Sequence, residues 1–271
     1  MRPRLRAVDS DRRPGPPWPV VALGGLAAAL LTLPLAALVI EAPWSAAAEQ
    51  LRAPAAVQAL RLSLTTSLLA VAVAFLLGVP LAWVQARVEY PGRSVIRALT
   101  TLPLVLPPVV GGIALLLAFG QRGLVGPALG SVGVRLPFTM AGAVAAEAFV
   151  ALPFLTLTVE GGLRQVDRRI EDAARTLGAS RWAVFRTVTL PLVRPSLTAG
   201  AVLAWARALG EFGATITFAG NLPGTTQTLP LFVYVTLNGS EPDGAIILSL
   251  VLLAASVVVL VALRDRWLRA L

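Results

Sequence analysis

The sequence predicts an all-α integral membrane protein with six transmembrane helices, and three observations lead to this fold class. Hydrophobic residues make up 56% of the 271 positions and charged residues only 14%, whereas roughly a quarter of the residues in a soluble domain are charged. The apolar residues fall in runs about as long as the ~20 residues that cross a bilayer. Most arginines fall in the connections on one side of these runs, as expected for cytoplasmic loops.

The charge balance sets the expected topology and excludes several chemistries. The formal net charge is +9, and all 23 basic residues are arginine. Because these arginines flank apolar runs, they indicate membrane orientation, and no nucleic-acid partner is expected. Cysteine, histidine and lysine are absent, which removes thiolate, imidazole and Schiff-base chemistry. We therefore expect no catalytic residue, no metal site and no cofactor bound by this chain.

The apolar runs divide the chain into tails and spans. Residues 1–19 are predicted to be a cytoplasmic tail, 20–59 the first span with its outer loop, 60–263 a core of five further spans, and 264–271 a second cytoplasmic tail. The first run is longer than the 7 to 15 apolar residues of a signal peptide, so it is interpreted as a retained span. The predicted spans are 20–40, 60–86, 99–119, 138–159, 196–218 and 245–263.

Two stretches are expected to depart from simple straight spans, one inside the third span and one in an outer loop. Pro103, Pro107 and Pro108 lie inside the third span, and proline removes a backbone donor, so this helix should be kinked or broken. A packing kink and a bent, pore-lining segment are both open interpretations. In the outer loop, the apolar stretch 229–237 is expected to form a short helix that could dip into the membrane.

The connection 160–195 holds seven arginines and the most regular polar pattern of the chain. A short helix from Glu171 can end at Gly178, since glycine readily takes the left-handed cap conformation. Ser180 can cap a second helix, which Pro191 is expected to stop. The spacing alone leaves two interpretations open: a linker resting on lipid headgroups with Trp182 as its anchor, or a surface that docks on another protein.

This connection resembles the EAA signature of ABC importer permeases. The resemblance implies an ABC type I importer permease fold in which this loop docks into a cytoplasmic ATPase subunit, the component that uses ATP and Mg. It also implies that the chain itself is not an enzyme. The signature positions matched are Glu171, Ala173, Ala174, Gly178, Leu190 and Pro191, and the ATPase-coupling candidates add Ala179 and Phe185.

Two further stretches are similar to molybdate permeases. These are 206–224 around the fifth span and 102–112 in the third, and the resemblance runs from about Leu60 to the C-terminus. It implies a homodimer in a prokaryotic inner membrane, served by two ATPase subunits and a periplasmic or extracellular oxyanion-binding protein. Molybdate is the expected cargo, with tungstate or sulfate as alternatives.

Three ionisable residues lie well inside the predicted spans, and each could serve either transport or helix packing. Arg207 and Glu211 lie four residues apart on one helical face, and Glu147 lies in the fourth span. Placing such a group inside the bilayer costs at least ~2.5 kcal/mol unless it is paired or hydrated. Arg207 either meets the oxyanion during passage or pairs with Glu211 or Glu147, and the packing role is favoured. The candidate path or gate residues are Pro107, Pro108, Arg207, Glu211, Thr215 and Thr217.

Two other classes of protein compete with this interpretation. A secondary transporter could use Glu147, Arg207 and Glu211 as a relay, but that leaves the connection 160–195 unexplained. An intramembrane enzyme is disfavoured because all six aspartates fall outside the predicted spans.

Overall fold

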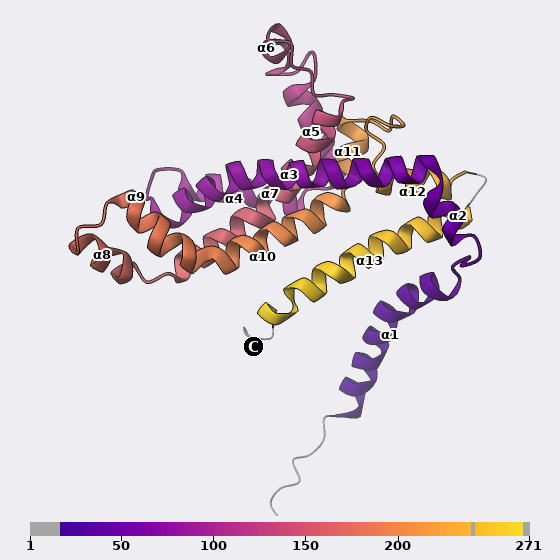
Figure 1. Cartoon of the computed structure of the whole chain (residues 1–271), viewed down its shortest axis with the longest axis horizontal. Coiled ribbons are helices and arrows are strands. Elements are labelled where there is room, and N and C mark those ends of the chain that lie inside the picture. Colours follow the sequence, from indigo (N-terminus) through magenta and orange to yellow (C-terminus); the bar gives the residue numbers. More distant parts are fainter. Residues whose placement is uncertain (1–16, 240–241, 268–271) are drawn as a thin grey trace, which may run out of the picture. The chain divides into compact units, whose positions relative to one another are not determined.

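The computed structural model describes residues 17–239 and 242–267, and every regular element in these residues is a helix (Figure 1). Five helices are long and apolar enough to cross a membrane. They are α1 (Trp18–Ile40), α3 (Pro54–Arg87), α7 (Met140–Gln165), the run Arg181–Leu209 and α13 (Pro242–Trp267). The predicted all-α membrane fold is confirmed.

The chain separates into two units, residues 1–42 and 43–271. In the first, α1 is a 23-residue helix whose residues are apolar all round, and none of them is buried. A helix without a polar face is suited to a lipid environment. The predicted first span therefore matches a helix of sufficient length.

In the second unit, α3, α7 and α10 (Leu190–Leu209) pack along one another and form the main core (Figure 1). Small residues line this interface. A methyl group on Gly200 would lie 3.0 Å from Leu155 Cδ1, and one on Gly78 would lie 2.8 Å from Thr156 Oγ1. Glycine and alanine let membrane helices approach closely, so this interface depends on small side chains. The buried alanines are Ala70, Ala74, Ala82, Ala86, Ala148, Ala151, Ala204 and Ala208.

Shorter helices surround this core. The apolar stretch of the outer loop forms α12 (Leu229–Leu237), as predicted, and Leu229 and Leu231 are buried where α12 contacts α3 and α13. The other short helices are α2 (Ala47–Arg52), α4 (Arg93–Val105), α5 (Pro108–Phe119), α6 (Gly126–Ser131), α8 (Arg168–Thr176), α9 (Arg181–Val184), the π-helical turn η1 (Phe185–Thr189) and α11 (Gly213–Phe218).

Two predicted spans are broken helices. The third consists of α4 and α5, with 13 and 12 residues, and the chain is extended at Leu106 and Pro107 between them. This break was expected from the prolines. The fifth was predicted as one helix over 196–218, and this continuity is wrong: α10 ends at Leu209 and α11 begins at Gly213. The Glu211 side chain accepts a hydrogen bond from Ala214 N at 2.8 Å, so it satisfies a free donor at the start of α11.

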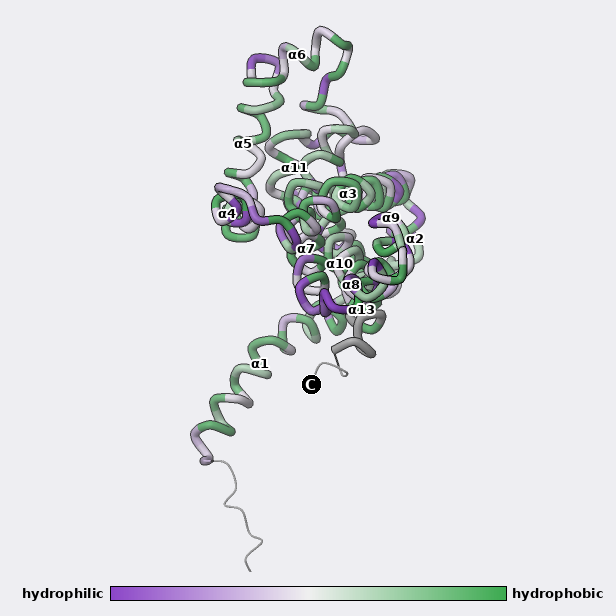
Figure 2. The backbone as a smooth tube through the Cα atoms, turned by 90° about the vertical axis from the view of Figure 1, so that its left-hand side faces the viewer, coloured by the Kyte–Doolittle hydropathy of each residue, from purple (hydrophilic) through white to green (hydrophobic). Residues whose placement is uncertain are grey.

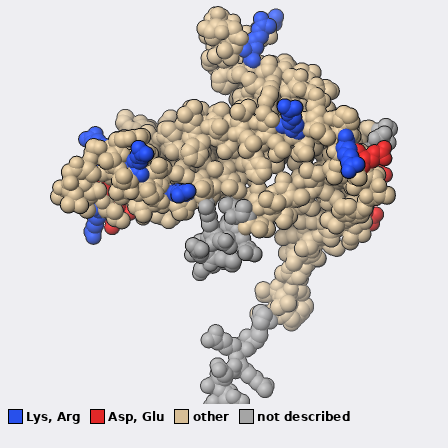
Figure 3. Space-filling model, viewed as in Figure 1, with Lys and Arg blue, Asp and Glu red and all other residues tan. Residues whose placement is uncertain are grey.

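Polarity is distributed unevenly over residues 43–271. Figure 2 shows largely hydrophobic colouring along α3 and α5, with hydrophilic segments at the connections between helices. Figure 3 shows arginines over the end of the unit that carries α8 and α9, and few charged side chains along the middle of the long helices. The α8–α9 end is thus rich in arginine, although Figure 3 also shows basic and acidic side chains at the opposite end of this unit.

Candidate functional site

The segment Arg168–Thr189, here called the joint, is a helix–turn–helix as predicted. Asp167 caps α8 by accepting a hydrogen bond from Arg169 N at 2.9 Å, and Ser180 caps α9 by accepting one from Ala183 N at 3.2 Å. Gly178 takes a φ of +90° between them, and Ala179 N donates to Ala174 O at 3.1 Å. A side chain at Gly178 would strain this left-handed turn. The turn therefore fixes the angle between the two helices.

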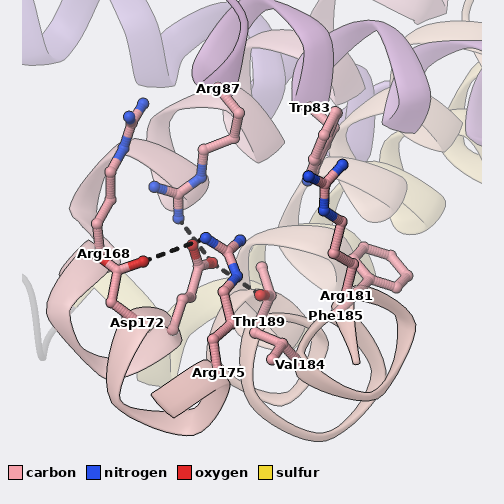
Figure 4. A pocket seen from close by; sticks show the side chains of 10 residues that line it. Trp83, Arg87, Arg168, Asp172, Arg175, Arg181, Val184, Phe185 and Thr189 are labelled. Carbon is pink, nitrogen blue, oxygen red and sulfur yellow. Dashed lines mark hydrogen bonds and ion pairs between the residues drawn. The ribbon is translucent and has the colours of Figure 1, made fainter. Parts of the chain in front are cut away.

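Glu171 holds the joint to the rest of the bundle. Its Oε1 atom lies 3.1 Å from Arg87 Nη2 and accepts a hydrogen bond from Thr189 Oγ1 at 2.7 Å. The Glu171 and Arg87 side chains are only 10% and 9% exposed. Arg87 is the last residue of α3 and Thr189 the last of η1. One carboxylate thus connects α8 to the ends of two other helices, and Figure 4 labels its two partners, Arg87 and Thr189.

Several apolar residues of the joint are exposed, among polar ones such as Arg169 and Arg186. Leu177 is 89% exposed and Trp182 69% exposed, and Ala173 is also exposed. The Trp182 ring stacks on Phe185 with centroids 5.5 Å apart. Large apolar groups beside a small residue give a shape that can fit another surface. Of the remaining coupling candidates, Ala174 and Ala179 are half-buried, whereas Leu190 and Pro191 are exposed.

Pro191 does not stop the second helix, contrary to the prediction. The run Arg181–Leu209 is continuous and passes through η1, where Leu190 N donates to Phe185 O. Pro191 has no N–H and its ring crowds the preceding turn, and a π-turn is one way for a helix to absorb such a disruption. Pro195 also lies inside α10. The second helix of the joint is therefore the start of the same continuous helix that enters the core as α10.

A second buried carboxylate lies near the joint, and sequence reasoning missed it. Glu160 is 1% exposed; its Oε1 lies 2.6 Å from Arg164 Nη2 and 3.6 Å from Arg97 Nε. The contact with Arg97 links α7 to α4, whereas the contact with Arg164 lies within α7. The four-residue spacing of Glu160 and Arg164 was a visible signal. The contact to Arg97, like the contacts of Glu171 to Arg87 and Thr189, depends on the fold.

The two helix breaks lie against each other, with Gly213 buried and Pro107 and Pro108 exposed. α5 and α11 pack against each other, and a methyl group on Gly213 would lie 2.7 Å from Pro108 Cβ. One on Gly112 would lie 2.6 Å from Thr217 Cβ. Both helices begin at their breaks, so Pro108 on one side lies against the start of α11 on the other. Membrane proteins tolerate broken helices where protein or a cavity surrounds them.

Arg207 pairs with Glu211 at the second break. Arg207 Nη2 lies 2.6 Å from Glu211 Oε2, with Glu211 1% exposed and Arg207 28% exposed. This geometry matches the packing interpretation, while a role in anion passage stays a prediction. Thr217 bonds back to Gly213 O at 2.8 Å, and Thr215 is fully buried without a hydrogen-bond partner among the described residues.

Glu147 forms no ion pair with Arg207 in the part of the chain that the structure describes. Its Oε1 accepts a hydrogen bond from Thr66 Oγ1 at 2.8 Å, which joins α7 to α3, and its Oε2 has no partner among the described residues. Thr66 was not recognised from the sequence, because a threonine inside an apolar run usually bonds to its own helix.

These features define a class of protein: a helical membrane component with two broken helices and a joint exposed at an arginine-rich end. Residues 74–271 match the family of binding-protein-dependent transport system inner membrane components. Because this match covers most of the chain, the protein belongs to that family and is an inner membrane component of such a transport system.

Similar proteins agree with this family. The chain is 44% identical to the molybdenum transport system permease protein ModB of Mycobacterium tuberculosis (87% of this chain, 89% of that protein). It is 44% identical to ModB of Escherichia coli (78% and 92%) and 35% identical to the sulfate transport system permease protein CysT of Escherichia coli (87% and 86%). A crystal structure of a bacterial ABC transporter that imports the acidic polysaccharide alginate shares the fold, with a TM-score of 0.72, 19% identity, and coverage of 92% of this chain and 94% of that one.

Proposed function

We propose that this chain is the permease subunit of an ATP-driven importer of a tetrahedral oxyanion, with molybdate as its cargo. It would act as a homodimer with two ATPase subunits and a periplasmic or extracellular oxyanion-binding protein. The observation that carries the proposal is the contact of Glu171 with Arg87 and Thr189, by which the exposed joint grips both α3 and the continuous helix leading to α10. A protein that pushed the joint would move two core helices together.

The proposed topology has six crossings per chain and both termini in the cytoplasm. In it, α4 and α5 together make one crossing, and α10 and α11 make another. The joint then lies on the cytoplasmic side, where ATP is available. The arginines of the joint and of α4 support this orientation, since cytoplasmic loops are rich in arginine and lysine.

The proposed coupling surface is the exposed side of the joint. Ala173 and Trp182 would contact the ATPase, while Gly178 keeps the angle between α8 and α9. Glu171 would act from inside, as the link through which a displacement of α8 reaches α3. Because η1 makes the joint continuous with α10, the same displacement also reaches the break at Glu211.

The proposed gate lies where the two breaks meet. A break between two helical segments can absorb a change of direction with few lost hydrogen bonds, because its backbone is already irregular. Pro108 and Gly213 are in close approach there. Arg207 and Glu211 would hold the end of α10 against α11, so that the anion passes an ion pair instead of a free guanidinium.

Molybdate is proposed because of the relatives. The identity to the two molybdenum permeases is 44%, against 35% for the sulfate permease over a similar share of this chain. Selection between molybdate, tungstate and sulfate would rest mainly with the separate binding protein. ATP would be hydrolysed by the partner subunit, with no cofactor bound to this chain.

Reconstitution tests the proposal. We expect proteoliposomes that hold this chain and its ATPase subunits to take up molybdate only when ATP and the loaded binding protein are both present. Uptake that persists without the ATPase subunits and follows a proton gradient would indicate a secondary transporter instead.

A further inference from the structure

A cavity lies between the joint and the end of α3, and its lining is rich in arginine. It has a volume of about 420 Å³ and is bounded by α3, α8, α9 and η1. Arg87, Arg168, Arg175 and Arg181 line it together with Glu171 and Asp172 (Figure 4). The lining therefore carries four positive and two negative formal charges.

The two carboxylates are already engaged. Glu171 contacts Arg87 and Thr189, and Asp172 Oδ1 lies 3.1 Å from Arg175 Nη1. Arg168 and Arg181 form no ion pair with any residue that the structure describes. The positive charges of these two guanidinium groups at the cavity wall are thus not neutralised by a carboxylate of the described residues.

Arg87 adds a second and independent sign of a ligand. Its side chain is only 9% exposed, and its Nε donor is buried without a hydrogen-bond partner among the described residues. A buried donor that lacks an acceptor costs free energy comparable to a lost hydrogen bond. An acceptor that entered the cavity beside Arg87 would remove this cost.

We propose that this cavity is a binding site for a tetrahedral oxyanion, either a free ion such as phosphate, sulfate or molybdate or the phosphate of a lipid headgroup. Guanidinium groups bind such oxygens in pairs, with charge-assisted hydrogen bonds. A water takes ~30 Å³, so the cavity holds a small anion with part of its hydration shell. A dianion would match the charge of the two unpaired arginines.

The anion would bridge helices that the proposed coupling movement displaces. Arg87 ends α3, Arg168 begins α8 and Arg181 begins α9. A bound oxyanion would therefore stiffen the joint. This consequence rests on the proposed function, whereas the binding itself does not.

Binding can be measured without any transport partner. The full-length chain in nanodiscs of phosphatidylcholine would be titrated with phosphate, sulfate and molybdate by isothermal calorimetry. Arg168→Gln and Arg181→Gln remove cavity arginines, while Arg169→Gln and Arg186→Gln remove the same charge from exposed positions outside the cavity. Circular dichroism would check that each variant keeps its helical content.

We expect saturable binding that weakens about tenfold or more in each cavity variant, because a hydrogen bond to a charged group contributes ~1.5–3 kcal/mol. The two exposed variants should bind as the unchanged chain does. Nanodiscs of phosphatidylglycerol separate the two sources. A free-ion site still binds the ion there, more weakly in the cavity variants than in the exposed variants, although the anionic surface lowers the apparent affinity of every variant. A headgroup site instead loses the free ion and retains a lipid in native mass spectrometry, and Arg168→Gln and Arg181→Gln release that lipid.

Two results would overturn the proposal. One is the absence of both saturable anion binding and a retained lipid in either nanodisc. The other is equal affinity in the cavity variants and the exposed variants, which would assign the binding to another part of the chain. The unpaired arginines would then be expected to form ion pairs with carboxylates of a docked protein. The proposed transport function would be unaffected.

Discussion

Replacing Glu171 by glutamine tests the link between the joint and the core. The glutamine oxygen can still accept the Thr189 hydrogen bond, but the Arg87 guanidinium loses its negative partner. Breaking one side of a buried ion pair typically costs 3–5 kcal/mol, because a charge stays buried without compensation. With Arg87 9% exposed, we expect Glu171→Gln to lower the free energy of unfolding by about 3 kcal/mol.

The assay is a double-mutant cycle with Arg87→Gln. The double variant should lose clearly less stability than the sum of the two single variants, since neither charge is then left alone. Thermal unfolding of the purified chain gives the stability, and ATP-dependent molybdate uptake gives the coupling. We expect uptake to fall in both single variants and to recover in part in the double variant.

Asp172 provides the matched control. It lies next to Glu171, but its ion pair with Arg175 has side chains 65% and 52% exposed. Exposed pairs contribute at most ~1 kcal/mol, so Asp172→Asn should change stability little. Equal losses for Asp172→Asn and Glu171→Gln, or additive effects around the cycle, would refute the reasoning.

Three further predictions follow from single contacts. Gly178→Ala should cost ~1–2 kcal/mol in the free energy of unfolding, because alanine is strained at a φ of +90°; unchanged thermal unfolding would contradict this. Gly213→Ala should place a methyl group too close to Pro108, where the two breaks meet, and lower the free energy of unfolding by ~1–3 kcal/mol. Molybdate uptake should fall as well. A variant with normal stability and normal uptake would exclude a tight contact there. Arg207→Gln should cost about 3 kcal/mol by leaving Glu211 buried and unpaired, and adding Glu211→Gln should restore the unfolding temperature; normal stability with lost uptake would instead indicate that Arg207 meets the anion.

Local sequence patterns were enough to predict most of the fold. Long apolar runs gave the membrane helices, and the prolines near Pro107 gave the break between α4 and α5. The caps at Ser180 and Gly178 gave the turn of the joint. Each of these features depends on residues close together in the chain, where helical geometry fixes the neighbours.

The features that escaped prediction depend on distant residues or on competing local effects. The contact of Arg87 with Glu171 joins residues 84 positions apart, and the bond of Thr66 to Glu147 spans 81. Pro191 suggested a helix end, but the helix continues past it because the π-turn η1 accommodates the proline. Glu211 lay in an apolar helical pattern, yet its side chain instead caps a new helix.

We propose that an ATPase subunit moves this chain through the exposed side of the joint. The sequence contains no cysteine, so a single Ala173→Cys can carry a benzophenone label for photo-crosslinking in the assembled transporter. Ala128→Cys in α6, also exposed, serves as the control position. We predict a cross-link from position 173 to the ATPase subunit that changes in yield between ATP-bound and nucleotide-free states. A cross-link from position 128 alone, or none from position 173 in an active transporter, would contradict the account.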